Sequence, residues 1–248
     1  MLELALDRPE AGNALTIPLA RALLRAAIAA DEDESVRCVV LTGRGRLFCA
    51  GGDVSGFVGG AVEAARHIKE ITAYLHAAIA RLMRVNKPLV TAINGPAAGA
   101  GLGLAIMGDV AIAARSAHFT VAYGAIGLTP DAGVSWLLPR LIGLRRAQEM
   151  ALGNRRVGAE EAVAIGLVSR VVDDADLAGA VEATAAQLAA SATEAIGRTR
   201  ALLLGSYDTP LETHLDAETR SISASVRSPH GQEGVAAFLA KRAPDFQS

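Results

Sequence analysis

Hydrophobic and polar positions along the 248-residue chain alternate between short apolar runs and segments with helical spacing. The runs that predict strands are residues 2–6, 36–41, 89–93, 110–113 and 167–172. The helical segments are residues 16–28, 68–82, 131–142, 144–152 and 159–165, and the pattern beyond residue 174 is helical almost to the end. Alternating strands and helices are typical of an α/β fold. We therefore predict a β/α core over residues 1–174 and a C-terminal helical region over residues 175–248.

Composition and charge exclude some partners. The chain is 51% hydrophobic and carries a net charge of -2, which gives no overall field to hold nucleic acid or an anionic membrane surface. The uncharged run 88–108 is long enough to cross a bilayer, but Asn94 and Pro96 interrupt it, so we expect buried protein. The first ten residues are too charged for an export signal. The two cysteines suit a reducing compartment, and the expected location is cytoplasmic.

Several common sites are excluded by spacing. Gly99, Gly101 and Gly103 imitate a dinucleotide-binding fingerprint, but Leu104 stands where its last glycine belongs. Neither glycine-rich segment ends as a Walker loop does, and no serine lies in a G-x-S-x-G elbow. The histidines are scattered without ligand spacing, so we expect no metal site, and helper or surface roles for His67, His76, His118, His214 and His230.

Two glycine-rich segments, residues 48–53 and 94–103, each follow a predicted buried strand. Small side chains leave their backbone N–H groups accessible, and the second segment leads into a helix whose first amides are unpaired. Glycines needed for turns and close packing explain each segment alone. If the two segments converge, they form an oxyanion hole.

A third segment, residues 126–140, carries Asp131 at the predicted start of a helix. By position the residue is expected to cap that helix, a contribution of about 1 kcal/mol. A carboxylate between a proline and a glycine at a helix start also suits a general base facing a pocket.

These segments together resemble the crotonase superfamily, the enoyl-CoA hydratase/isomerase family. The supporting residues lie at 7–10, 13–15, 41–53, 87–109, 127–140, 166–168 and 233–239, which covers essentially the whole chain in order. The resemblance implies a spiral of repeated ββα units and a C-terminal helical region used for trimerisation, as a homotrimer or a dimer of trimers. It also implies an acyl-CoA substrate and no cofactor beyond the coenzyme A moiety of that substrate.

Carried over residue by residue, the resemblance places the oxyanion hole on the N–H groups of Gly52 and Ala100 and a catalytic carboxylate at Asp131. The residues expected to line the substrate groove are Asn13, Ala14, Leu15, Ala50, Gly51, Asp53, Val54, Gly99, Tyr123, Thr129 and Pro130. The CoA phosphates would be met by basic side chains, among which the sequence does not choose; the candidates are Arg8, Arg21, Arg25 and Lys241.

The departures from the family pattern bear on the reaction. Hydratases of the family use two glutamates to hold and split one water, and the corresponding positions here are Gly103 and Tyr123. Asp131 stands where several isomerases of the superfamily, and a dehalogenase, carry a catalytic aspartate. The run 130–140 is most similar to the branch that contains the ring-epoxide isomerase of phenylacetyl-CoA degradation, although Val134 replaces a glycine usual there.

The sequence therefore predicts a double-bond or ring-epoxide isomerase that forms an enolate in the oxyanion hole and uses an aspartate as acid and base. One alternative is an enoyl-CoA hydratase of fatty-acid or aromatic-acid degradation that uses another acid, with Tyr123 as the polar side chain available. The other is a non-catalytic acyl-CoA binding trimer.

Overall fold

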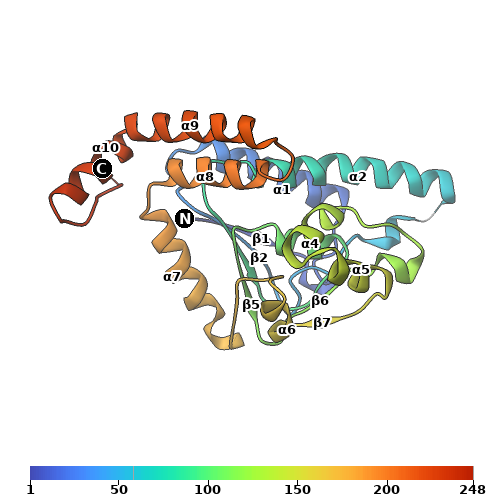
Figure 1. The fold of residues 1–248 in the computed structure, drawn as a ribbon. Helices are drawn as coiled ribbons and strands as arrows, with labels where there is room; N and C mark the ends of the chain where they lie inside the picture. Colours follow the sequence, from blue (N-terminus) through green and yellow to red (C-terminus); the bar gives the residue numbers. More distant parts are fainter. Residues whose placement is uncertain (58, 248) are drawn as a thin grey trace.

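A central parallel sheet forms the scaffold of the computed structural model, which describes residues 1–57 and 59–247. Its strand order is β1-β2-β3-β5-β8 (Figure 1). The strands are β1 (Leu2–Leu6), β2 (Val39–Gly43), β3 (Leu89–Ile93), β5 (Val110–Ala114) and β8 (Arg170–Val172). Because neighbouring strands are parallel, the segments that follow β2 and β3 leave the sheet at the same edge. The α/β fold class predicted from the sequence is confirmed.

A smaller sheet lies beyond that edge, with the order β4-β6-β7. It is built from β4 (Ala97–Ala98), β6 (His118–Thr120) and β7 (Val157–Gly158), where β4 and β6 are parallel and β6 and β7 antiparallel. The sequence pattern predicts none of these strands, because runs of two or three residues are too short to show a period of two. Their pairing holds the second glycine-rich segment in place.

Helices cover both faces of the central sheet. Alternate strand residues face opposite sides, so Val39 and Leu41 pack into the large core that also contains side chains of α1 (Ile17–Glu32) and α2 (Ala61–Leu82). Val40 points the other way, into a cluster closed by α7 (Leu177–Ala189). Thr16 caps α1 as its position in the sequence predicts, because its hydroxyl accepts the Leu19 N–H at 3.4 Å.

Shorter helices surround the smaller sheet. They are α3 (Ala100–Ile106), α4 (Val134–Ile142), α5 (Leu144–Leu152) and α6 (Ala159–Ala164). Single 3-10 turns, η2 (Val54–Phe57) and η3 (Tyr123–Ile126), connect the loops near α2 and α4. Buried side chains occupy every position of α3, which places its N-terminus against the core.

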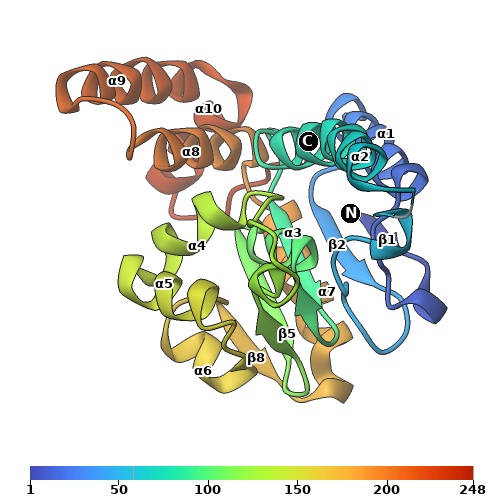
Figure 2. The same ribbon diagram turned by 90° about the vertical axis from the view of Figure 1, so that its right-hand side faces the viewer.

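The C-terminal helices extend away from the sheet. α8 (Thr193–Gly205) packs near the end of α2, whereas α9 (Leu211–Arg227) and α10 (Pro229–Leu239) project outward (Figures 1 and 2). α9 contains no buried residue. Large apolar side chains are exposed on these three helices: Leu203 on α8, and Leu211, Leu215, Ile222, Val226, Val235, Phe238 and Leu239 on the projecting arm of α9 and α10. No helix in residues 1–57 or 59–247 is both long and apolar enough to span a membrane.

Two predicted strand boundaries are wrong by about three residues. The strand expected at 36–41 occupies Val39–Gly43, because its register follows β1, with Leu2 opposite Val39 and Leu6 opposite Gly43. The strand expected at 167–172 begins only at Arg170, where pairing with Ile112 of β5 starts. Boundaries therefore follow the partner strand rather than the apolar run.

Candidate active site

The two glycine-rich segments meet beside the central sheet. Cys49 pairs with Ala97 in an isolated bridge, and the Ala98 N–H donates to the Cys49 carbonyl at 3.0 Å. Gly51 lies at the contact with a φ of +104°, and a Cβ there would stand 2.9 Å from the Ala98 oxygen and 3.6 Å from the Ala100 nitrogen. Only glycine allows this approach, so the convergence that an oxyanion hole needs depends on position 51.

The predicted oxyanion donors, Gly52 and Ala100, line the same cavity. Ala100 is the first residue of α3, so its N–H has no partner within the helix. Neither amide donates to a protein acceptor in the described ranges. Both donors therefore remain available to an oxygen bound in the cavity.

The cavity has a volume of about 270 Å³ and largely apolar walls. Its lining residues come from the two glycine-rich segments, from α2 and from the loop before α4. The side chains that make its apolar wall are Leu15, Val54, Phe57, Ile68, Ile71, Leu75, Ile126 and Leu128. Two carboxylates reach it, those of Asp53 and Asp131.

Asp53 is bound on both carboxylate oxygens. Its Oδ1 accepts the Ser55 hydroxyl at 2.5 Å and the Ser55 N–H at 3.1 Å, while Oδ2 accepts Arg8 Nη1 at 3.2 Å. These donors, Ser55 first and Arg8 after it, hold the pKa of Asp53 below its ordinary value. A carboxylate stabilised in this way is a weak base, and it fixes the loop that carries Gly52.

Asp131 does not cap α4, and the expectation that it would is wrong. The helix starts at Val134, Gly133 occupies the capping position with a φ of +78°, and no side chain caps it. Ala132, at a φ of +50°, turns the chain between the two. The Asp131 carboxylate consequently faces the cavity, where its Oδ1 accepts a hydrogen bond from the Tyr123 hydroxyl.

Tyr123 is held as a neutral donor. Burial raises the pKa of Tyr123 well above its ordinary value, and the adjacent Asp131 carboxylate raises it further. Its ring lies beside Gly99, since a Cβ added there would be 3.9 Å from Tyr123 Cζ. The hydroxyl group therefore keeps its proton and donates a hydrogen bond to the carboxylate.

His76 on α2 approaches Asp131 from the other side. Its Nε2 is 3.8 Å from Asp131 Oδ2 and accepts the Ala132 N–H at 3.2 Å. That acceptor role places the proton of the neutral ring on Nδ1. From the sequence we expect only a helper or surface role for His76. No spacing motif links it to Asp131, because the two residues are 55 positions apart in the chain.

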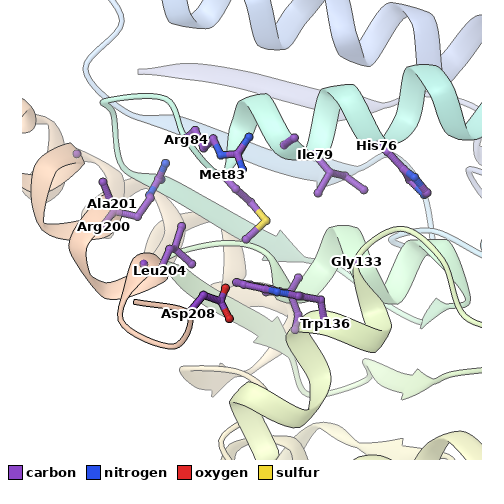
Figure 3. Close-up of a pocket in the computed structure, with 14 residues that line it drawn as sticks. His76, Ile79, Met83, Arg84, Gly133, Trp136, Arg200, Ala201, Leu204 and Asp208 are labelled. Atoms are coloured by element: carbon purple, nitrogen blue, oxygen red, sulfur yellow. The ribbon is translucent and has the colours of Figure 1, made fainter. Parts of the chain in front are cut away.

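A second cavity of about 750 Å³ opens beyond His76, between α2, α4 and α8 (Figure 3). In this view, His76 and Ile79 on α2 and Met83 just after it lie across from Trp136 of α4, and Leu204 of α8 lies at the far end of the cavity from His76. The Arg140 guanidinium stacks on the Trp136 ring at 3.9 Å from its centroid. His76 thus lines this second cavity and lies beside Asp131, which lines the first.

Gly103 on α3 faces the turn that carries Asp131. A Cβ at position 103 would collide with the Ala132 carbonyl oxygen and would lie 3.2 Å from the Ala132 Cβ. The space of a side chain at 103 is therefore taken by the backbone of this turn. Position 123 is the other one that corresponds to a hydratase glutamate, and the Tyr123 hydroxyl there already donates a hydrogen bond to Asp131.

Three predicted groove residues do not line the cavity: Asn13, Ala14 and Pro130. Asn13 is fully buried, and its amide donates to the carbonyls of Arg44 at 2.9 Å and Leu47 at 2.8 Å. The side chain stabilises the loop after β2 and is not placed to contact a ligand. The predicted groove residues that do line the cavity are Leu15, Ala50, Gly51, Asp53, Val54, Gly99, Tyr123 and Thr129.

Comparison with known proteins identifies the family. The sequence pattern of the family described as enoyl-CoA hydratase/isomerase matches residues 1–248. The chain belongs to this family. The described residues contain no cluster of three or more histidine, cysteine or acidic side chains that could hold a metal ion.

Named relatives within the enoyl-CoA hydratase/isomerase family differ in their reactions. A 1,2-epoxyphenylacetyl-CoA isomerase of Escherichia coli K12 is 38% identical over 99% of this chain and 94% of the relative. A 4-chlorobenzoyl coenzyme A dehalogenase of an Arthrobacter species is 39% identical over 94% of this chain and 85% of the relative. The crystal structure of an enoyl-CoA hydratase from Polaromonas sp. JS666 superposes with a TM-score of 0.93 at 34% identity, covering 98% and 95% of the two chains. The family is thus established, and with it an acyl-CoA enzyme, while the reaction has to be argued from the site.

Proposed function

We propose that this enoyl-CoA hydratase/isomerase family member is an isomerase of acyl-CoA thioesters, acting on an unsaturated acyl-CoA or an epoxidised phenylacetyl-CoA. One observation carries the proposal. Asp131 is a cavity carboxylate with an oxygen, Oδ2, that accepts no hydrogen bond from the described residues, whereas Asp53 is bound on both oxygens. Asp131 is therefore the cavity carboxylate with an oxygen available to accept a substrate proton.

For a β,γ-unsaturated thioester, the proposed reaction needs only one carboxylate. Asp131 Oδ2 removes a proton from the α-carbon, and the electron pair moves onto the thioester oxygen as an enolate. The N–H groups of Gly52 and Ala100 stabilise the negative charge where it develops. The same carboxylic acid then returns the proton to the γ-carbon, so that the double bond becomes α,β and no atom is gained or lost.

The variant Asp131→Asn tests the proposal. We expect turnover of a β,γ-enoyl-CoA to fall by about 10²- to 10⁴-fold, the usual contribution of a positioned acid–base group. The control is Asp216→Asn, which removes an exposed carboxylate on α9 paired with Arg220 and should leave turnover unchanged. Unchanged turnover in Asp131→Asn would remove this residue from the mechanism.

Hydration is disfavoured by the same geometry. It requires one group to activate water and another to deliver a proton, yet Gly103 has no room for a side chain and the Tyr123 hydroxyl is committed to Asp131. Rapid hydration of crotonyl-CoA would contradict this view. Tight binding of acyl-CoA without turnover of any thioester in a panel would favour a non-catalytic binder.

A second candidate function is hydrolytic dehalogenation of an aryl-CoA, favoured by the position of His76 near Asp131 Oδ2. The carboxylate would displace chloride from the ring to form an aryl ester, and water activated by His76 would hydrolyse it, releasing a hydroxyaryl-CoA. His76 Nε2 already accepts the Ala132 N–H at 3.2 Å and would have to give up this contact to act as the base. Chloride release from 4-chlorobenzoyl-CoA distinguishes this candidate from the isomerase.

A further inference from the structure

One side chain contacts both halves of the proposed catalytic apparatus. The Tyr123 ring lies against Gly99, the residue immediately before Ala100, and its hydroxyl donates to Asp131 Oδ1. The two halves come from different elements: the oxyanion donor Ala100 from the start of α3, and Asp131 from the turn before α4. η3, which begins at Tyr123, joins them.

We infer that Tyr123 is a positioning residue for the Asp131 base: its hydroxyl anchors Oδ1 and leaves Oδ2 free to move the substrate proton. The inference rests on the proposed isomerase function. Its basis is the geometry of the carboxylate, which accepts a hydrogen bond from a described side chain on Oδ1 alone.

Among the titratable groups near Asp131, Tyr123 is the one that donates a hydrogen bond to its carboxylate. His76 on α2 is the titratable residue near Oδ2, but its Nε2 accepts the Ala132 N–H and so does not donate to the carboxylate. Cys49 lies near Tyr123, and burial raises the pKa of this thiol to about 12, which keeps it neutral. Removal of the Tyr123 hydroxyl therefore removes the side-chain hydrogen bond that orients Asp131.

A positioning role differs from a packing role in what it changes. Loss of packing lowers stability and affects every step, whereas loss of a hydrogen bond to the charged carboxylate raises the pH at which that carboxylate ionises. Tyr123→Phe keeps the ring against Gly99 and removes only the hydroxyl. The matched control is Tyr74→Phe, which removes a hydroxyl that accepts Arg21 Nη2 at 3.2 Å between α1 and α2.

The first measurement is steady-state isomerisation of a β,γ-enoyl-CoA as a function of pH. In Tyr123→Phe we expect kcat to fall by about 10- to 100-fold with KM changed less than about threefold, since the interaction concerns proton transfer rather than binding. The acidic limb of the kcat profile should move to higher pH by roughly 0.5 to 1 unit. Tyr74→Phe should change none of these. Equal losses in both variants, or an unshifted acidic limb in Tyr123→Phe, would overturn the positioning role.

The second measurement does not depend on turnover. In protein labelled with ¹³C at aspartate carboxyls, the Asp131 signal is assigned by its disappearance in Asp131→Asn and titrated in wild type and Tyr123→Phe. A midpoint that rises in Tyr123→Phe supports the inference even if no thioester is isomerised, in which case only the proposed function fails. An unchanged midpoint refutes the inference whether or not the protein is an isomerase.

Discussion

At the residue scale, the contact between Gly103 and the turn that carries Asp131 explains why this turn and a side chain at position 103 exclude one another. The Ala132 carbonyl fills the position of a side chain at 103. The positive φ of Ala132 puts it there, and the same turn directs the Asp131 carboxylate into the cavity. The absence of a side chain at Gly103 on α3 thus makes room for the turn that carries Asp131 before α4.

Gly103→Ala is expected to destabilise the protein by about 1–3 kcal/mol, because the new methyl group must displace backbone rather than a flexible side chain. Denaturation by urea measures the change. The control is Gly179→Ala in α7, where an added Cβ meets nothing within 4 Å and where alanine should stabilise the helix by roughly 0.5–1 kcal/mol. A Gly103→Ala protein as stable as wild type would show that the turn yields easily.

The sequence predicts which residues matter at this scale better than it predicts what they do. It identifies Gly52, Ala100, Asp131 and Tyr123, and all four line one cavity. The position of Asp131 alone wrongly suggests that this residue caps the following helix, because a left-handed alanine at 132 leaves no signal in the sequence. The role of the Asn13 side chain cannot be predicted from the sequence, since only the fold shows which backbone carbonyls its amide reaches.

At the scale of elements, an ion pair between a buried arginine and a partly exposed aspartate joins α8 to the sheet. The Arg200 guanidinium, 7% exposed, pairs with Asp109 and donates to the carbonyls of Leu82 and Val85 at 3.1 and 2.9 Å. Asp109 in turn accepts the Leu89 N–H at 2.7 Å, at the start of β3. One side chain therefore ties α8 to the end of α2 and to the edge of the core.

Arg200→Ala should lower the free energy of unfolding by about 1–3 kcal/mol, because it leaves two buried carbonyls without a donor and the partly exposed Asp109 charge without its partner. Arg198→Ala is the matched control on the same helix. Its partner Glu194 is four residues earlier on a more exposed surface, and such pairs contribute about 0.3–0.5 kcal/mol. Similar losses in the two variants, measured by urea denaturation, would contradict the role given to Arg200.

A second ion pair fixes the end of the chain and depends on pH. Arg242 and the Asp245 N–H hold the pKa of Glu233 at about 2, below its ordinary 4.5. Because the folded value is the lower one, the contact stabilises α10 and the following segment fully above about pH 4.5 and is lost as the pH falls toward 2. We expect protection of the Asp245 amide from hydrogen exchange to decline over that range. In Glu233→Gln the decline should be absent, and an identical decline would exclude Glu233 as its cause.

How much of the elements can be predicted depends on their length. The helix α2 shows a clear helical period because it is buried along one face, and β3 shows a continuous apolar run because all its residues are buried. The paired strands β4, β6 and β7 arise from tertiary pairing of two or three residues, which no local pattern reveals. The starts of β2 and β8 depend likewise on the strands beside them.

At the scale of the whole molecule, the projecting arm of α9 and α10 leaves apolar side chains in solvent. Ile222 is 69% exposed and Phe238 is 82% exposed. Exposed apolar surfaces of this kind mark interaction sites, and the resemblance to the family implies that another copy of the chain covers them. We propose a homotrimer or a dimer of trimers for this protein.

Sedimentation velocity tests this assembly. The wild-type protein should sediment as a trimer or hexamer, and the double variant Ile222→Asp with Phe238→Asp should shift toward monomer, because charges replace buried apolar area. Lys69→Asp, a change on the exposed side of α2, controls for added negative charge. A wild-type monomer at tens of micromolar would contradict the proposal.

The crowding at Gly103 also bears on how such a protein can change its reaction over time. Any side chain at this position requires the Ala132 carbonyl to move, and Ala132 directly follows Asp131 in the chain. A change that adds a side chain at 103 must therefore alter the turn before α4 together with α3.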